Sequence, residues 1–173
     1  MQTRLTDELD SLQPADLDAG QVFSGKRSGT TVRGYAAPSA YTPAIDPDYI
    51  FHESSRDVVV WFLNPQEPLY VFGPTGCGKT TCIKQLAARL NYPVFEVTGH
   101  GRLEFADMVG HLTVKNGNMT FEYGPLALAM RYGALLLLNE IDLTSPEIAA
   151  GLNSVLDGSP LCIAENGGEL IVP

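Results

Sequence analysis

The stretch GPTGCGKT, residues 73–80, decides the fold of this 173-residue chain. It follows the apolar segment LYVF (69–72), which predicts a strand, and it opens the segment TTCIKQLAARL (80–90). In that segment Ile83, Leu86, Ala87 and Leu90 recur at the spacing of one buried helical face. A glycine-rich turn between a strand and a helix, in the pattern Gly-x-x-x-x-Gly-Lys-Thr, is a P-loop.

The chemistry of a P-loop explains each residue type in it. Glycines let the loop curl so that successive backbone N–H groups point at phosphate oxygens, and the helix N-terminus adds partial positive charge. Lys79 is expected to reach the β- and γ-phosphates, and the Thr80 hydroxyl to ligate Mg²⁺. The bland alternative is a chance glycine turn, which the strand–loop–helix context argues against. The predicted cofactors are ATP and Mg²⁺, and the predicted nucleotide-binding residues are Gly73, Pro74, Thr75, Gly76, Cys77, Gly78, Lys79, Thr80 and Thr81.

A second stretch, ALLLLNEID (134–142), supplies the acid that such a site requires. Its apolar part, 134–138, predicts a buried strand whose carboxyl end opens onto the ligand crevice. Glu140 is then placed to polarise the water that attacks the γ-phosphate, and Glu140 and Lys79 are the predicted catalytic residues. Without the P-loop, a core strand running into a solvated turn would be the default interpretation.

Helical and strand patterns alternate along the rest of the chain. Helices are predicted over RDVVVWFLN (56–64) and RLEFADMVG (102–110), over GPLALAMRYG (124–133), and over SPEIAAGLNSVLDG (145–158) with Ser145 as N-cap; VFEVT (94–98) predicts a strand. Asn116-Gly117 predicts a hairpin turn, and 159–172 predicts a second hairpin. Continuously apolar strands that alternate with helices imply an α/β fold with a parallel sheet. Residues 1–45, which are acidic and then rich in Gly, Ser, Thr and Pro, predict a flexible tail or linker, or an arm that orders on a partner, before a core over 46–173.

Composition excludes several classes of protein. The formal net charge of −9 argues against a nucleic-acid-coating surface, and Lys26, Arg27 and Arg33 are interpreted as solvated linker charges, with a nucleic-acid arm as the minor alternative. The sequence contains neither a membrane-length apolar run nor a secretory signal, so a cytoplasmic location without a membrane partner is predicted. An odd count of three cysteines suggests reduced thiols.

These motifs resemble those of the AAA+ ATPases, whose Walker A and Walker B motifs are similar to GPTGCGKT and LLLLNEID. The closer resemblance, over about 43–173, is to the MoxR-like group, particularly the AAA+ subunit of aerobic cobaltochelatase. It rests on PAIDPDYIF, AARLNYPVFEV, ADMVG, KNG and GPLALAM. The resemblance implies a three-layer α/β/α fold in which the hairpins at 111–123 and 159–172 are inserts that face the pore of a ring and touch the client. It also places Tyr49-Ile50-Phe51 near the adenine, and simple packing of that segment on the core is the alternative.

The sequence departs from the family pattern in two ways. The Walker B aspartate of the family aligns with Asn139, which together with Thr80 is the predicted metal site; an amide supplies no charge, so weaker Mg²⁺ binding and slowed hydrolysis are expected. Asp142 could compensate in part, or could be a turn residue. In addition, the family's sensor strand, arginine finger and lid lie beyond Pro173. The sensor strand would sit between 69–72 and 134–138, so the chain is interpreted as the N-terminal part of a larger ATPase, with unpaired backbone and exposed apolar surface at that slot.

The leading functional hypothesis is an ATP-hydrolysing subunit that remodels a protein client. By resemblance it would form a hexamer-like homo-oligomeric ring, whose neighbours supply arginine, and would work with a partner carrying a von Willebrand A-like domain. The alternative is a nucleotide-binding regulatory or scaffold module with little hydrolysis. A small-molecule phosphotransferase is the third hypothesis, and the chain has no Arg-rich lid to support it.

Overall fold

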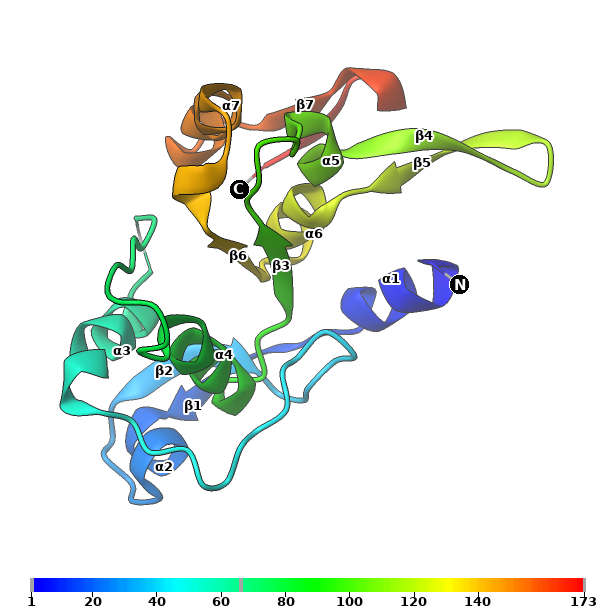
Figure 1. Ribbon diagram of the computed structural model, residues 1–173. Helices are drawn as coiled ribbons and strands as arrows, with labels where there is room; N and C mark the ends of the chain where they lie inside the picture. The colour runs from blue at the N-terminus through cyan, green and yellow to red at the C-terminus, as the bar shows by residue number, and fades with distance from the viewer. Residues whose placement is uncertain (1, 66, 173) are drawn as a thin grey trace. The chain divides into compact units, whose positions relative to one another are not determined.

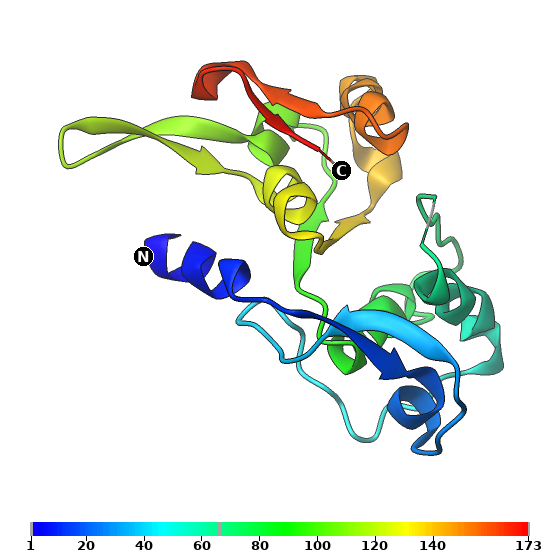
Figure 2. The same cartoon turned by 180° about the vertical axis from the view of Figure 1, so that it is seen from behind.

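The computed structural model describes residues 2–65 and 67–172 and divides into two compact units, Met1–Val94 and Phe95–Pro173. Each unit is described by itself (Figures 1 and 2). The elements of the first unit are α1 (Gln2–Asp10), β1 (Pro14–Asp18), α2 (Ala19–Ser24), β2 (Thr31–Tyr35), η1 (Glu53–Ser55), α3 (Arg56–Leu63) and α4 (Lys79–Arg89). The helices predicted at 56–64 and 80–90 are therefore confirmed as α3 and α4.

The N-terminal segment, which was predicted as a flexible tail or linker, contains two helices and a strand pair. β1 and β2 form an antiparallel pair in which Pro14 lies opposite Tyr35 and Asp18 opposite Thr31. The physical reason is an anchor on the end of α4, because the Tyr35 N–H donates to the Leu90 carbonyl at 2.9 Å and both residues are buried. Gly34 permits this approach, since a Cβ there would lie 2.5 Å from the Leu90 oxygen. The mobility of residues 1–45 and a domain boundary at residue 45 stay predictions, and the boundary between the compact units falls at Val94.

A capped turn joins β1 to β2. Asp18 is the N-cap of α2, and its carboxylate accepts from the N–H groups of Ser28 (3.0 Å), Gln21 (2.9 Å) and Gly29 (2.9 Å). These bonds favour the charged form, so the N–H of Ser28 first, then those of Gln21 and Gly29, lower the pKa of Asp18 to about 2. The loop that carries Lys26 and Arg27 is thereby tied to the strand pair.

The strand predicted at 69–72 does not form. Residues 68–74 have no regular secondary structure, and within the described residues no strand pairs with this segment. A strand is defined by hydrogen bonds to a neighbouring strand, so an apolar sequence alone does not produce one. Tyr70 and Phe72 stack on each other with ring centroids 6.3 Å apart and remain 67% and 81% exposed, which agrees with the exposed apolar surface expected here.

The second unit contains most of the predicted elements. β3 (Val94–Thr98), whose first residue belongs to the first unit, pairs with β6 (Leu135–Asn139). Between them in the chain lie α5 (Phe105–Val109), β4 (Gly110–Lys115), β5 (Asn118–Tyr123) and α6 (Pro125–Tyr132). After β6 come η2 (Ile141–Leu143), α7 (Pro146–Leu156), β7 (Leu161–Ile163), η3 (Ala164–Asn166) and β8 (Glu169–Ile171). Asn116 and Gly117 adopt φ of 52° and 81°, both positive, as the predicted two-residue hairpin turn requires.

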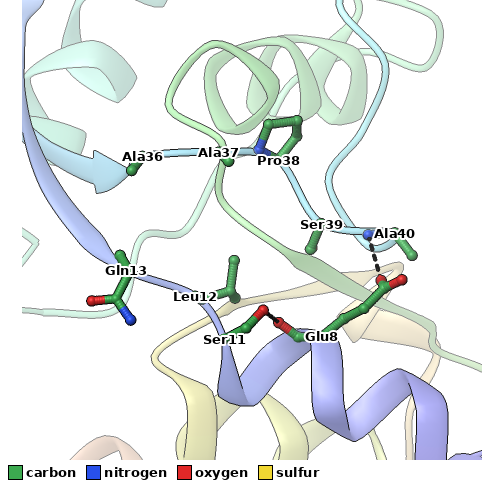
Figure 3. Close-up of a pocket in the computed structure, with 9 residues that line it drawn as sticks. All are labelled: Glu8, Ser11, Leu12, Gln13, Ala36, Ala37, Pro38, Ser39 and Ala40. Atoms are coloured by element: carbon green, nitrogen blue, oxygen red, sulfur yellow. Dashed lines mark hydrogen bonds between the residues drawn. The ribbon is translucent and has the colours of Figure 1, made fainter.

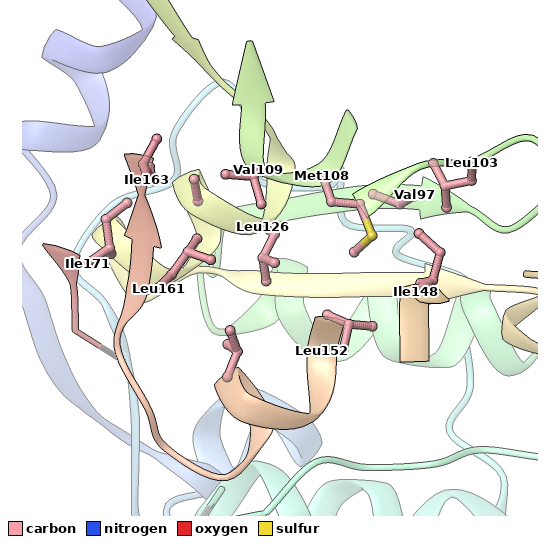
Figure 4. Packing of buried hydrophobic residues seen from close by; sticks show 12 residues of the cluster. Val97, Leu103, Met108, Val109, Leu126, Ile148, Leu152, Leu161, Ile163 and Ile171 are labelled. Carbon is pink, nitrogen blue, oxygen red and sulfur yellow. The ribbon is translucent and has the colours of Figure 1, made fainter. Parts of the chain in front are cut away.

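One apolar cluster holds this second unit together (Figure 4). Its side chains come from β3, from the loop before α5, from helices α5, α6 and α7, and from the β7–β8 hairpin. Met108 and Ala127 in it are fully buried. The members are Val97, Leu103, Met108, Val109, Leu126, Ala127, Ile148, Leu152, Val155, Leu161, Ile163 and Ile171. Leu136 and Leu138 of β6 pack against the cluster, so the cluster also supports the strand that ends at Asn139.

A polar network ties the base of the β4–β5 hairpin to the β7–β8 hairpin. The Tyr123 hydroxyl donates to a Glu169 carboxylate oxygen at 2.6 Å, and the Asn166 amide donates to the same hydroxyl at 3.0 Å. Arg131 contacts Glu169 at 3.1 Å and lies over the Tyr123 ring at 5.1 Å. Burial, followed by the bond to Glu169, raises the pKa of Tyr123.

A surface cavity of about 340 Å³ lies in the first unit (Figure 3). Its lining is made by the end of α1 and by residues 36–40, and the Ala40 N–H donates to the Glu8 carboxylate at 3.3 Å across it. None of its lining residues belongs to 73–81. Within the described residues, no helix has the length and apolar character needed to cross a membrane.

Candidate nucleotide-binding site

The P-loop forms an exposed glycine turn that leads directly into α4. Gly73, Gly76 and Gly78 have φ of 155°, 79° and 84°, values that residues with a Cβ rarely adopt. A Cβ at Gly76 or Gly78 would meet no atom within 4 Å, so the turn requires glycine there for its backbone conformation and not for space. The loop curls back on itself, because the Cys77 N–H donates to the Pro74 carbonyl at 3.4 Å.

Lys79 is the first residue of α4 and its side chain folds over the loop. Its Nζ donates to the carbonyls of Gly73 (2.8 Å) and Pro74 (2.9 Å). The ammonium is therefore held against the loop that precedes α4, and the N-terminus of that helix also favours anions. Ammonium, helix N-terminus and glycine turn together make a donor set that fits a polyphosphate. Thr80 and Thr81 follow in the same turn of the helix.

The other end of α4 holds the segment expected to approach the adenine. Gln85 is buried; its Nε2 donates to the Ala44 carbonyl at 3.1 Å, and its Oε1 accepts from the Asp46 N–H at 2.9 Å. Arg89 donates to that same Oε1 at 2.6 Å and to the Asp46 carbonyl at 3.1 Å. One helix thus carries the P-loop at its start and fixes residues 44–46 at its end.

The aromatic residues of that segment pack on the unit. Phe51 lies under the Arg89 guanidinium at 4.9 Å and against Tyr49, with ring centroids 5.1 Å apart. For Tyr49 and Phe51 this supports the packing interpretation. Ile50, between them, is 86% exposed. The adenine contact stays a prediction, with Ile50 as the side chain available to make it.

In the second unit, β6 ends at Asn139, one residue later than the predicted strand. The side-chain Nδ2 of Asn139 donates to Glu96 Oε1 at 2.7 Å, and the main-chain carbonyl of Asn139 accepts from the Gly99 N–H at 2.8 Å. Glu96 is a residue that the sequence analysis missed, although a lone carboxylate between the apolar residues of VFEVT was the available signal. Carboxylate and amide oxygens are ligands of the type that Mg²⁺ prefers, so this pair fits a magnesium site.

Glu140 follows in a backbone conformation that is rare outside glycine. Its φ and ψ are 53° and 45°, and it is exposed at the turn that leads from β6 into η2. Left-handed backbone at a bulky residue costs on the order of 1 kcal/mol and is concentrated at functional sites. Gly99 packs against this turn, since a Cβ there would lie 2.4 Å from the Glu140 carbonyl oxygen. Asp142 lies within η2, as the turn interpretation predicted.

The predicted residues thus fall into two groups. Residues 73–81 lie together in the first unit, whereas Asn139 and Glu140 lie together in the second, beside Glu96 and Gly99. The three cysteines, Cys77, Cys82 and Cys162, are not paired with one another, and their redox state stays a prediction.

Comparison with known proteins decides the family. Residues 68–173 match the AAA domain of the dynein-related subfamily. The chain belongs to this family. The match spans both groups of candidate residues and confirms the predicted resemblance to the AAA+ ATPases. The relatives NorQ, CobS and GvpN confirm the resemblance to the MoxR-like group. The AAA domain is a P-loop NTPase fold with α/β content and a parallel sheet, so the predicted fold class is confirmed as well.

Several curated proteins are similar to this chain. Protein NorQ of Paracoccus denitrificans is 35% identical over 60% of this chain and 38% of its own length. Aerobic cobaltochelatase subunit CobS of Sinorhizobium is 29% identical over 92% of this chain and 49% of its own length. Gas vesicle ATPase GvpN of Ancylobacter aquaticus is 38% identical over 57% of this chain and 30% of its own length. The chain spans less than half the length of each of these relatives.

Proposed function

We propose that this chain is the nucleotide-binding part of an ATPase that binds ATP with Mg²⁺, hydrolyses it and uses the energy to remodel a protein client. The observation that carries the proposal is the glycine turn at 73–78, closed by Lys79 at the start of α4. The main-chain N–H groups of the turn and the Lys79 ammonium bind the phosphate tail. The Thr80 hydroxyl and the side-chain oxygen of Asn139 face the metal ion. Mg²⁺, when bound, neutralises charge on the phosphates.

Glu140 has the role of orienting the attacking water in this proposal. A carboxylate at the end of a strand can accept a proton from water in the transition state, and the preset backbone of Glu140 limits the directions in which its side chain can point. Asn139 contributes a neutral oxygen where the family has a carboxylate, so turnover is expected to be slow.

A protein client and a ring assembly extend the proposal. The β4–β5 hairpin exposes Val114 (71%) and Met119 (69%) near its tip, and the β7–β8 hairpin exposes Leu170 (62%). Exposed apolar side chains on hairpins suit contact with a client. CobS is named as a subunit of a chelatase, which supports a partner protein; a von Willebrand A-like partner and a hexamer-like ring are proposed on the family resemblance. The cytoplasmic location stays a prediction.

Calorimetric titration with ATP and Mg²⁺ tests the phosphate-binding role. Lys79→Ala is expected to weaken binding by at least tenfold, because a charge-assisted bond to phosphate is worth about 1.5–3 kcal/mol. Lys26→Ala removes the same charge from an exposed position of the same unit and serves as the control, with wild-type affinity expected. Equal affinity in Lys79→Ala and wild type would refute the assignment.

The second candidate function is a nucleotide-binding regulatory module. It is favoured by one observation, the amide at 139 bonded to a neighbouring carboxylate where the family places an acid. Glu140→Gln separates the two functions. The ATPase proposal predicts that this variant keeps ATP affinity and loses phosphate release relative to wild type. If the chain is instead a regulatory module, wild type should release phosphate no faster than Glu140→Gln, while both proteins bind ATP.

A further inference from the structure

Glu96 is a charged residue in an otherwise apolar strand that the proposed function has not used. Along β3, Phe95 and Val97 are buried, whereas Glu96 and Thr98 alternate onto the exposed face. On that face the Glu96 carboxylate accepts the Asn139 amide at 2.7 Å. The bond joins neighbouring strands at the end of β6, next to the Glu140 turn.

This bond sets the orientation of the Asn139 side chain. Only the NH₂ group of an amide can donate, so a carboxylate at Oε1 turns Nδ2 toward Glu96 and leaves Oδ1 as the acceptor that faces away from that bond. The pair as a whole carries one negative charge and several oxygen atoms. A family aspartate carries the same single charge on one residue.

The two residues are also chemically matched. A carboxylate at 139 would bring a second anionic oxygen to within hydrogen-bond distance of Glu96, and two carboxylates this close resist being charged together. In the absence of a cation, Glu96 is therefore better matched by an amide at 139 than by an acid. At this place in the chain the negative charge lies on β3, and the residue at the end of β6 is neutral.

We propose that Glu96 supplies the negative charge toward Mg²⁺ that Asn139 lacks. In this proposal Glu96 also orients the side-chain oxygen of Asn139, Oδ1, for the same ion. This inference rests on the proposed function, because the metal ion accompanies the nucleotide. Glu96 is a positioning and charge-supplying residue, and its effect is on Mg²⁺-dependent binding.

The test is calorimetric titration with a non-hydrolysable ATP analogue, in excess Mg²⁺ and in excess EDTA, on wild type, Glu96→Gln and the double variant Glu96→Gln/Asn139→Asp. Glutamine at 96 retains an acceptor oxygen for the Asn139 amide and removes only the charge. We expect Glu96→Gln to reduce the affinity gained from Mg²⁺ by about tenfold, as loss of a supporting group at a metal site does. The affinity in EDTA should stay within about twofold of wild type.

In the double variant the negative charge lies at position 139 on β6, where the carboxylate can accept a hydrogen bond from the amide at position 96. The double variant should therefore regain most of the affinity that wild type gains from Mg²⁺. Glu165→Gln, an exposed change of the same kind in the same unit, is the matched control and should behave as wild type. Thermal unfolding by circular dichroism checks that each variant is folded. An undiminished Mg²⁺ effect in Glu96→Gln, or a double variant as weak as the single one, overturns the inference. Absence of analogue binding by wild type in both buffers would instead refute the proposed function.

Discussion

Replacing Gly99 by alanine tests whether the turn at Glu140 is as tightly supported as the structure indicates. Gly99 is buried, and a Cβ there would lie 2.4 Å from the Glu140 carbonyl oxygen and 2.7 Å from Thr144 Cγ2. Ordinary contacts begin at 3.4 Å, so the backbone at Glu140 would have to move by 3.4 − 2.4, about 1 Å. Gly99 cannot move away from Glu140 freely, because the Gly99 N–H donates to the main-chain carbonyl of Asn139 at 2.8 Å.

The magnitude follows from this displacement. Overpacking a closed site costs about 1–3 kcal/mol of unfolding free energy. A 1 Å displacement of a group that orients a reactant lowers turnover by on the order of 100-fold. We therefore expect Gly99→Ala to lower stability by about 1–3 kcal/mol and to depress ATP hydrolysis, while the P-loop keeps its ATP affinity.

The assay is urea unfolding followed by circular dichroism, with phosphate release measured on the same preparations. Gly101→Ala is the matched control, because a Cβ at Gly101 meets no atom within 4 Å. Its stability should be unchanged or higher by up to about 1 kcal/mol, as alanine restricts the unfolded chain. Equal stability and turnover in the two variants would show that Gly99 does not support the Glu140 turn.

Three further perturbations test other parts of the fold. Because bonds led by the Ser28 N–H lower the pKa of Asp18 from 3.8 to about 2, its stabilising effect is complete above pH 3.8 and is lost as pH falls through 2. The unfolding free energy of Asp18→Asn should therefore lie below that of wild type at pH 7 and approach it between pH 4 and pH 2 (about the interval between the two pKa values); a difference that stays constant over this interval would contradict the role of Asp18. Tyr123→Phe removes a 2.6 Å bond to a β8 carboxylate and should cost about 1–2 kcal/mol in urea unfolding; a loss under 0.3 kcal/mol (about the measurement error) would contradict the network. Met108→Ala empties a fully buried position in the core and should cost about 2–5 kcal/mol, and a cost below about 1 kcal/mol would mean that the cluster repacks.

Elements with local causes were predictable from the sequence. The hairpin at 116–117 follows from two residues that tolerate positive φ, and α7 begins at the predicted Pro146 after Ser145. The P-loop belongs to the same class, because glycine spacing and a helix start specify its backbone without help from distant residues. In each case neighbours in the chain carry the information.

Elements that depend on distant partners were not predictable. The β1–β2 pair is anchored by the end of α4, more than fifty residues away, so the composition of 1–45 suggested a tail. Residues 69–72 have the sequence of a buried strand and lack a paired strand among the described residues. Glu96 could be noticed as a charge in an apolar strand, but its bond to Asn139 arises only when β3 and β6 pair.

The central claim is that main-chain amides of the loop at 73–80 hold the phosphate tail of a nucleotide. Amide ¹H–¹⁵N spectra of the labelled chain, recorded while ATP and Mg²⁺ are added, test it at the atoms concerned. The resonances of Gly76, Gly78 and Lys79 should shift together and saturate at one ATP per chain. Saturating ATP binding that leaves these three resonances in place would contradict the claim.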